Sequence, residues 1–158
     1  MQTFIINPDT KQPVTIDEWR KDKNPTRANL VLLDLDGYKL LMAKNHSEKE
    51  YNWQDANKYA ADFTADGFSG FRLRTRKENV DIYDCRFLGQ LDETLKLIDG
   101  NANRGWSWGC ERDTDPAYSD RGAWFFNGNY GNAYYNYYFY VAFLAVPVAL
   151  YPSEAKDK

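Results

Sequence analysis

The stretch Ala123-Trp-Phe-Phe-Asn-Gly-Asn-Tyr-Gly-Asn-Ala-Tyr-Tyr-Asn-Tyr-Tyr-Phe-Tyr140 carries the strongest fold signal in this chain. Aromatic and apolar residues stand on both sides of a segment rich in Gly and Asn, a pattern typical of strands joined by a turn. Residues 123–127 and 137–148 are therefore predicted to be strands, and residues 106–108 a further one. From Asn101 onward the helical period is lost, so the last third of the chain is predicted to form a loop-rich antiparallel sheet.

The predicted strand over residues 137–148 is apolar on both of its faces. Alternate residues of a strand point to opposite faces, and both sets are apolar over residues 141–146. A strand of this kind is typical of a position inside a sheet that is covered on both sides. We therefore expect it to be central in its sheet.

Upstream of this region the pattern predicts a hairpin and a short lead-in segment. Asp36-Gly37 separates two apolar runs within residues 30–43, which predicts a type I′ turn. Thr15 and Glu18 have capping-box spacing, which predicts a short helix before the hairpin. The expected domain organisation is a lead-in segment over residues 1–29, a folded domain over residues 30–152 and a charged tail over residues 153–158.

Two or three short helices are predicted between the hairpin and the C-terminal sheet. Asn52 is a good helix cap, with Trp53, Ala56, Ala60 and Phe63 on one face of the helix that follows. Thr75 and Glu78 form a second capping box, opening a helix expected to bury Val80 and Tyr83. A third helix is predicted over residues 91–98, ended by Gly100. Helices followed by a separate antiparallel sheet indicate an α+β domain.

Composition narrows the classes of function. The chain has 158 residues and a net charge of −3, with no basic cluster of the kind that binds nucleic acid. Its N-terminus lacks the pattern of a signal peptide, and the apolar run over residues 141–150 is too short to span a membrane. The two cysteines, Cys85 and Cys110, are interpreted as reduced and buried. No nucleic acid, membrane insertion, metal or cofactor is predicted.

Five short motifs resemble a known family. Gly70-Phe-Arg-Leu-Arg-Thr-Arg-Lys-Glu78 is similar to the Gly-Trp-Arg-Leu-Pro-Thr-x-x-Glu signature of Lcl-type C-terminal domains. The other motifs follow in the family's order, at Trp53, Trp106-Ser107, Ala123-Trp124 and Val146–Leu150. The resemblance covers roughly residues 30–150. It implies a C-type lectin-like fold and a place among bacterial surface and phage proteins. Arg74 departs from the signature, which has Pro at that position.

The order of elements also resembles the variable proteins of diversity-generating retroelements, such as phage tropism determinants. Those systems mutate adenines, and an Asn codon altered in this way can encode Tyr, Phe, Ser, Asp, Gly or Ala. Residues 118–140 are rich in that set. The resemblance implies a hypervariable binding surface in this stretch, displayed by a phage virion or a bacterial cell surface.

The same stretch has the composition of a binding surface. Half of the tyrosines lie between Tyr130 and Tyr140, interleaved with Asn and Gly, as in antibody paratopes. With unbroken alternation, Tyr134, Asn136 and Tyr138 would share one face and Tyr135 and Tyr137 the other. Too many hydroxyl groups are present for both faces to be core, although burial of some of these residues in a strand remains the alternative.

Three tryptophans could belong to the binding surface or to the core. Trp124 is assigned to the core, and Trp108 rather than Trp106 is taken as the residue that faces a ligand. The predicted ligand-binding residues are Trp108, Tyr118, Asn127, Asn129, Tyr130, Asn132, Tyr134, Tyr135, Asn136, Tyr137 and Tyr138.

The sequence offers little for catalysis or metal binding. It lacks a nucleophile elbow, a phosphate-binding Gly loop and a zincin helix, so no catalytic residue is predicted. The four carboxylates within residues 111–120 could hold calcium, but a solvated loop is favoured because their spacing matches no EF-hand. We expect a non-enzymatic receptor-binding or adhesin-type protein that binds a host or cell-surface protein or glycan. The alternative is a structural or oligomerisation module of a phage virion or a bacterial surface assembly.

Overall fold

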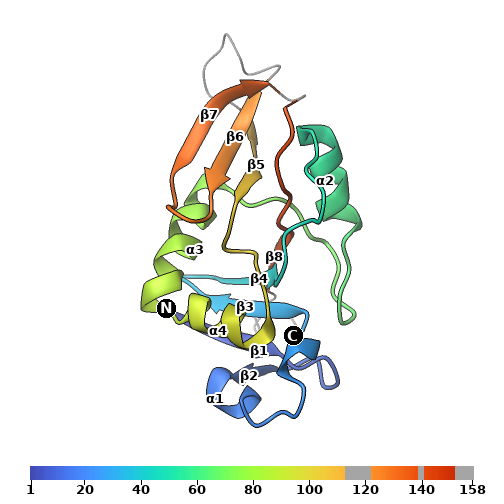
Figure 1. Ribbon diagram of the computed structural model, residues 1–158, viewed down its shortest axis with the longest axis vertical. Helices are drawn as coiled ribbons and strands as arrows, with labels where there is room; N and C mark the ends of the chain where they lie inside the picture. Colours follow the sequence, from blue (N-terminus) through green and yellow to red (C-terminus); the bar gives the residue numbers. More distant parts are fainter. Residues whose placement is uncertain (113–121, 139–140, 152–158) are drawn as a thin grey trace.

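The structure, a computed structural model, describes residues 1–112, 122–138 and 141–151, and for residues 135–138 it describes the backbone alone. Helices and strands follow one another in a mixed order along the chain (Figure 1). The elements are β1 (Gln2–Ile6), β2 (Pro13–Thr15), α1 (Ile16–Trp19), the 3₁₀ helix η1 (Pro25–Arg27), β3 (Leu30–Asp34), β4 (Lys39–Ala43), α2 (Trp53–Asp62), α3 (Arg76–Leu88), α4 (Leu91–Ile98), β5 (Trp106–Arg112), β6 (Gly122–Asn127), β7 (Ala133–Tyr138) and β8 (Val148–Leu150).

The strands of the described residues form two antiparallel sheets. One sheet has five strands in the order β2-β1-β3-β4-β8, and the other has three in the order β5-β6-β7. Figure 1 shows the five-stranded sheet across the lower half of the molecule and the three-stranded sheet rising above it, with α2 on one side and α3 on the other. The predicted α+β class is therefore confirmed.

The N-terminal residues belong to the main sheet, so the predicted lead-in segment over residues 1–29 is wrong. β1 lies between β2 and β3, pairing Ile5 with Val31 and with Val14. Ile5 and Ile6 are fully buried on opposite faces of the sheet. The local sequence gives little indication of β1, because no turn residues precede this strand and its pairing with β3 is a long-range contact. The predicted short helix is present as α1, with Thr15 as its N-cap. Residues 153–158 lie outside the described residues.

The predicted hairpin over residues 30–43 is confirmed as β3 and β4, but its turn is of a different type. Asp34 pairs with Lys39, and Gly37 has a φ of +88°. Asp36 is not among the residues with positive φ, whereas a type I′ turn needs positive φ at both central positions. Only the glycine therefore adopts the left-handed conformation.

All three predicted helices after the hairpin are present, and side-chain caps start the first two. The Asn52 side chain accepts a hydrogen bond of 2.8 Å from the backbone N–H of Asp55 at the start of α2. At the start of α3, Thr75 and Glu78 form the complete capping box. α4 ends in the left-handed residue Asp99, next to Gly100. These caps are local interactions, which is why the sequence located them.

Replacing Asn52 by alanine should lower the free energy of unfolding by about 1 kcal/mol. The side-chain acceptor for the Asp55 N–H is lost, while the buried face of α2 stays unchanged. A melting temperature about 2–4 °C lower is expected for a domain of this size. Asn52→Ser is the matched control and should retain most of the stability, because serine caps nearly as well as asparagine. Equal losses in both variants would contradict the capping role.

α3 buries a different face from the one predicted. Ile82 and Cys85 pack against the five-stranded sheet, together with Leu91 and Leu95 of α4. Val80 lies outside this face and is exposed, and Tyr83 is only half-buried. The prediction that α3 buries Val80 was wrong because the tertiary position of the sheet, rather than the hydropathy of single residues, selects the inner face.

Residues 141–147 are not a strand, and β8 lies at the edge of its sheet, so the predicted central strand is also wrong. β8 pairs only with β4 among the strands of the described residues. Ala145, Val146 and Pro147 are nevertheless buried, where the chain passes from the three-stranded sheet to the five-stranded one (Figure 1). An apolar run indicates burial, but it does not distinguish a strand from a buried connection. The fully covered central strand is β3, whose Val31 and Leu32 face opposite clusters of the core.

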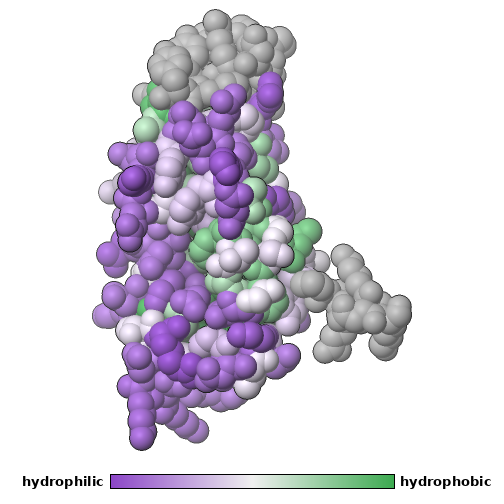
Figure 2. Space-filling view, turned by 90° about the vertical axis from the view of Figure 1, so that its right-hand side faces the viewer, coloured by the Kyte–Doolittle hydropathy of each residue, from purple (hydrophilic) through white to green (hydrophobic). Residues whose placement is uncertain are grey.

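The side of the molecule that carries α2 is largely hydrophilic. Figure 2 shows this side, with hydrophobic residues gathered near the middle of the long axis. Underneath α2, Ala56 and Ala60 are fully buried against residues of the three-stranded sheet, among them Trp108 and Phe125. Small side chains on the helix let it approach the sheet closely, so the large rings of the sheet fill the space between them.

Candidate functional site

An aromatic column runs along one face of the three-stranded sheet. It consists of Trp106, Trp108, Phe125, Tyr134 and Phe143. In the strand register, Phe125 is paired with Trp108 on one side and with Tyr134 on the other. Paired residues point to the same face of a sheet, and Trp106 shares that face with Trp108 by alternation.

The rings of the column contact one another closely. Phe125 stacks on Phe143 with 4.5 Å between ring centroids and on Tyr134 with 5.4 Å. Trp106 contacts Phe125 at 5.5 Å and Tyr134 at 5.3 Å. Each such pair adds about 0.5–1.5 kcal/mol beyond the burial of its area, so the column is a rigid unit.

Burial falls steadily along the column. Trp108 is 1% exposed and Phe125 is 5% exposed, whereas Trp106 is 39% and Tyr134 is 37% exposed. The indole N–H of Trp108 donates to the carbonyl of Tyr51 at 2.8 Å, which satisfies its only polar group inside the protein. Trp106 and Tyr134 thus form the open end of a column whose inner end is core.

A tight turn next to this open end presents further polar and aromatic groups. The turn covers residues 128–132 and joins β6 to β7. The side-chain oxygen of Asn127 accepts hydrogen bonds from the backbone N–H groups of Asn129 at 2.9 Å and Tyr130 at 3.3 Å. Tyr130 is 70% exposed at the tip. The side-chain amide of Asn132 donates to the hydroxyl of Tyr134 at 3.0 Å, which ties the turn to the column.

We call Trp106, Asn129, Tyr130, Asn132 and Tyr134 the aromatic site. The rings of Trp106 and Tyr134 are inclined at 47° to each other, so they do not form a single flat surface. Asn129, Tyr130 and Asn132 add exposed hydrogen-bonding groups at its border. Large rigid rings beside adaptable polar groups are the arrangement that binding surfaces use.

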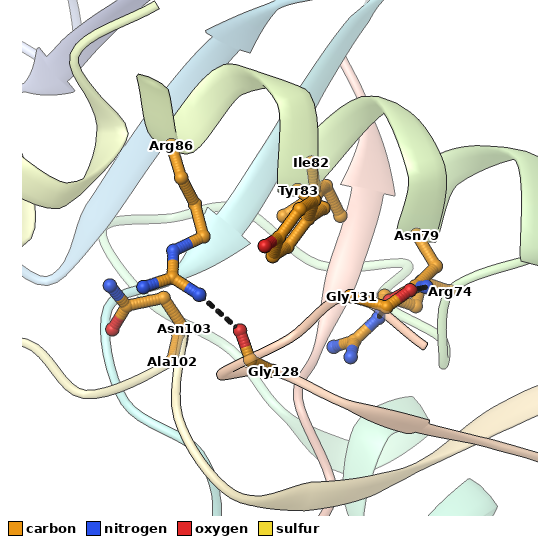
Figure 3. A pocket seen from close by; sticks show the side chains of 9 residues that line it. All are labelled: Arg74, Asn79, Ile82, Tyr83, Arg86, Ala102, Asn103, Gly128 and Gly131. Atoms are coloured by element: carbon orange, nitrogen blue, oxygen red, sulfur yellow. Dashed lines mark hydrogen bonds between the residues drawn. The ribbon is translucent and has the colours of Figure 1, made fainter. Parts of the chain in front are cut away.

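α3 supports the turn from the opposite side. The Asn79 side-chain amide donates to the carbonyl of Gly131 at 3.2 Å, and Arg86 donates to the carbonyl of Gly128 (Figure 3). Gly131 has a φ of +74°, and a Cβ at this position would lie 2.4 Å from the ring of Tyr83. Only glycine therefore allows the turn to approach α3 so closely.

The cavity between α3 and the turn is too small to be the binding site. Its volume is about 10 Å³, which is the space that one water molecule requires. Figure 3 shows the residues around it, which come from α3, from Arg74 just before α3, from the segment before β5 and from the turn. Binding by this region therefore has to use the exposed surface.

A buried arginine links the far face of the three-stranded sheet to α3. Arg74 donates to the Asn79 side chain at 3.1 Å and to the Ser107 hydroxyl at 2.8 Å, and its guanidinium lies 5.0 Å from the centre of the Phe126 ring. Burial lowers the pKa of Arg74 to about 10, so it remains a cation at neutral pH. The position at which the resemblance expects proline thus holds a structural hydrogen-bond donor.

The structure places four predicted site residues together at the surface: Asn129, Tyr130, Asn132 and Tyr134. Two predictions were wrong. Trp108 is core, because α2 and Phe143 cover it, and the buried Asn127 side chain serves the turn instead of a ligand. The predicted core position of Trp124 is confirmed. Tyr118 lies outside the described residues, and so do the side chains of Tyr135, Asn136, Tyr137 and Tyr138.

The exposed residue that the sequence did not select is Trp106. Trp106 and Trp108 lie two residues apart on one strand, so they share a face and have the same local signal. They differ in their neighbours: Trp108 packs in the buried cluster that contains Ala56 and Ala60 of α2, and Trp106 is not part of that cluster.

The backbone of β7 also departs from the predicted pattern. Ala123 pairs with Tyr137, and Phe125 pairs with Tyr134. Between these two pairs, β7 therefore contains one residue more than β6. This β-bulge interrupts the alternation, and the assumption of an unbroken two-residue period over residues 134–137 is wrong.

Neither cysteine is set up as a nucleophile. Both are free, as predicted, with Cys85 buried and Cys110 half-buried. Burial raises the pKa of both thiols, so they stay protonated at neutral pH. Within the described ranges, no three His, Cys, Asp or Glu side chains gather closely enough to hold a metal ion. The calcium alternative concerns residues 111–120, most of which lie outside those ranges.

Comparison with models of protein families and with curated protein sequences finds no match for this chain. No helix in the described part of the chain combines the length and the apolar composition that crossing a membrane requires.

Proposed function

We propose that this protein is a non-enzymatic binding domain, of receptor-binding or adhesin type, and that the aromatic site contacts a host or cell-surface protein or glycan. The observation that carries this proposal is the open end of the column. Trp106 and Tyr134 contact each other at 5.3 Å and rest on the buried Phe125. Rings that are already immobilised lose little rotamer entropy when a ligand stacks on them, which favours binding.

We further propose that the α+β domain is a C-type lectin-like fold of the Lcl type. The motifs that resemble the family support this proposal by their positions in the structure. Trp53 opens α2, the Thr75–Glu78 capping box opens α3 and Trp106 opens β5. Ala123-Trp124 lies in β6, and the C-terminal motif enters β8. By the same resemblance, the domain belongs to a phage virion or a bacterial cell surface. The resemblance to the variable proteins of diversity-generating retroelements implies that the sequence of residues 118–140 is hypervariable.

Loss of two tyrosine rings should abolish attachment while the fold stays intact. The change is the double substitution Tyr130→Ala with Tyr134→Ala. Aromatic hot spots cost about 2 kcal/mol or more each, so attachment should weaken by a factor of about 100 or more. The measurement is binding of the labelled protein to a panel of intact bacterial cells and immobilised glycans. The melting temperature should fall by a few degrees, because Tyr130 is 70% exposed, whereas Tyr134 is 37% exposed and loses its ring contacts with Trp106 and Phe125.

Leu150→Ala is the control for this experiment. Leu150 is a large side chain that is 56% exposed, but it lies on β8 of the five-stranded sheet, outside the aromatic site. Its removal should leave attachment unchanged. Attachment that survives the double substitution, or that is lost equally in the control, would overturn the proposed function. Unfolding of the double variant would show that the tyrosines are core residues.

A second candidate function, an assembly module, has its own supporting observation. Val80, Phe87 and Leu88 on α3 are large apolar side chains that are exposed in the single chain. Light scattering separates the two functions by giving the mass in solution. A stable assembly that dissociates when Phe87 is replaced by alanine would assign this surface of α3 to subunit contacts. A monomeric mass would contradict the assembly function.

A further inference from the structure

One side chain of α3 holds the turn that carries Tyr130. The guanidinium of Arg86 donates through Nη1 to the carbonyl oxygen of Gly128 and, at 3.0 Å, to that of Asn129 (Figure 3). These two carbonyls lie immediately before Tyr130 in the turn. Arg86 therefore acts on the backbone that orients Tyr130 and not on the Tyr130 ring itself.

Arg86 is itself held in one orientation. Its Nε and Nη2 donate to the two carboxylate oxygens of Asp92, at 2.8 and 3.1 Å, and the Asn103 side-chain amide donates to the same carboxylate. The ring of Tyr83 lies 5.5 Å from the guanidinium carbon. Two parallel hydrogen bonds to one carboxylate fix the plane of a guanidinium. The ammonium group of a lysine cannot make this two-point contact. The remaining Nη1 is thus directed at the turn.

The turn needs such support because it contains two glycines. Gly128 and Gly131 have no side chains to restrict the backbone, so an unsupported turn would sample many conformations. The conformational entropy that such a turn loses upon binding would reduce the affinity for the ligand. The side chain of Asn127 holds the backbone N–H groups of Asn129 and Tyr130, and that of Asn79 holds the carbonyl of Gly131. Arg86 holds the two carbonyls before the tip.

We infer that Arg86 is a positioning residue, which holds the turn over residues 128–132 so that Tyr130 is presented in its binding conformation. The inference rests on the proposed function and names a residue that acts on the aromatic site from α3. Asp92 belongs to the same device, because it orients the guanidinium. The pair makes the turn part of the rigid scaffold while Tyr130 itself stays exposed.

The test combines a structural readout with a binding readout. Amide hydrogen exchange of Asn129, Tyr130 and Gly131 is measured in the intact protein and in Arg86→Ala, Arg86→Lys and Asp92→Asn. Loss of the two hydrogen bonds should speed exchange at the turn by about tenfold. Arg86→Lys and Asp92→Asn should give intermediate rates. Attachment to the bacterial cells that the intact protein labels should weaken by about tenfold in Arg86→Ala and less in Arg86→Lys.

Asn52→Ala is the control for a general loss of stability. It weakens α2, which is remote in sequence from the turn, and it should change neither turn exchange nor attachment. Unchanged exchange in Arg86→Ala overturns the inference. The inference also fails if Arg86→Ala shows faster exchange but full attachment while the Tyr130 and Tyr134 double variant loses attachment. The proposed function stands in that case. If the double variant keeps attachment, the proposed function fails and the positioning role fails with it. Should Arg86→Ala not fold, Arg86→Lys and Asp92→Asn decide by the same criteria.

Discussion

Replacing Trp108 by alanine is expected to lower the free energy of unfolding by about 3–5 kcal/mol. The indole is 1% exposed and fills the space between β5, α2 and Phe143, so its removal leaves a cavity in the core. The Tyr51 carbonyl also loses its hydrogen-bond donor. Thermal unfolding followed by circular dichroism should show a melting temperature lower by on the order of 10 °C.

The matched comparison for Trp108 is Trp106→Ala. Both residues are tryptophans on the same face of β5, but Trp106 is 39% exposed. Its loss should cost clearly less stability and should instead weaken attachment. Trp108→Phe retains an aromatic ring and should recover part of the stability that alanine loses. If Trp108→Ala left the melting temperature unchanged and abolished attachment, the ligand-facing interpretation of Trp108 would be right and the core position wrong.

Replacing Glu78 by alanine is expected to destabilise the fold by about 3 kcal/mol. The buried Glu78 carboxylate accepts two hydrogen bonds from Arg72, at 2.7 and 2.8 Å, and one of 2.9 Å from the Thr75 backbone. Its loss removes the only carboxylate that the Arg72 guanidinium contacts among the described residues, leaving the Leu73 carbonyl at 3.2 Å, and it opens the capping box of α3. The value is set at the lower end for broken buried pairs because the Arg72 side chain is partly exposed and remains partly hydrated.

The same carboxylate predicts a dependence of stability on pH. Burial by itself raises the pKa of Glu78, but hydrogen bonds from Arg72 and Thr75 hold that pKa below its ordinary value of 4.5. A lowered folded-state pKa gives stability that is present above pH 4.5 and is lost as the pH falls through the lowered value. Urea unfolding between pH 7 and pH 3 measures this loss. Glu78→Gln should be less stable at pH 7 and should lose less stability upon acidification, and an identical pH profile would contradict the role of Glu78.

The helices were predicted from sequence because their start signals are local. Asn52 and Thr75 each accept a hydrogen bond from a backbone N–H three residues further on, and such contacts do not depend on the rest of the fold. The hairpin of β3 and β4 was found for the same reason, since its turn lies between two adjacent apolar runs. The type of that turn was missed, because the left-handed conformation is confined to Gly37.

The candidate site was only partly predicted. The composition of residues 129–134 indicated exposure, and Asn129, Tyr130 and Tyr134 are indeed exposed. Asn127 belongs to the same Asn- and Gly-rich stretch, and Trp108 lies two residues from the exposed Trp106, but both are buried. Which aromatic residue reaches solvent depends on the contacts of α2 and Phe143 with the sheet, and no local pattern contains that information.

By itself, the sequence determined the helix starts, the hairpin over residues 30–43 and the aromatic, Asn- and Gly-rich character of the β6–β7 turn. These features follow from interactions between residues a few positions apart. Only the tertiary structure decided that β1 is an inner strand of the sheet, that residues 141–147 are a connection buried at residues 145–147, and that Trp106 rather than Trp108 is open to solvent. The physical reason is that burial depends on which distant elements pack together. An apolar residue that is buried and one that is exposed can have the same neighbours in the sequence, so the local pattern does not distinguish them.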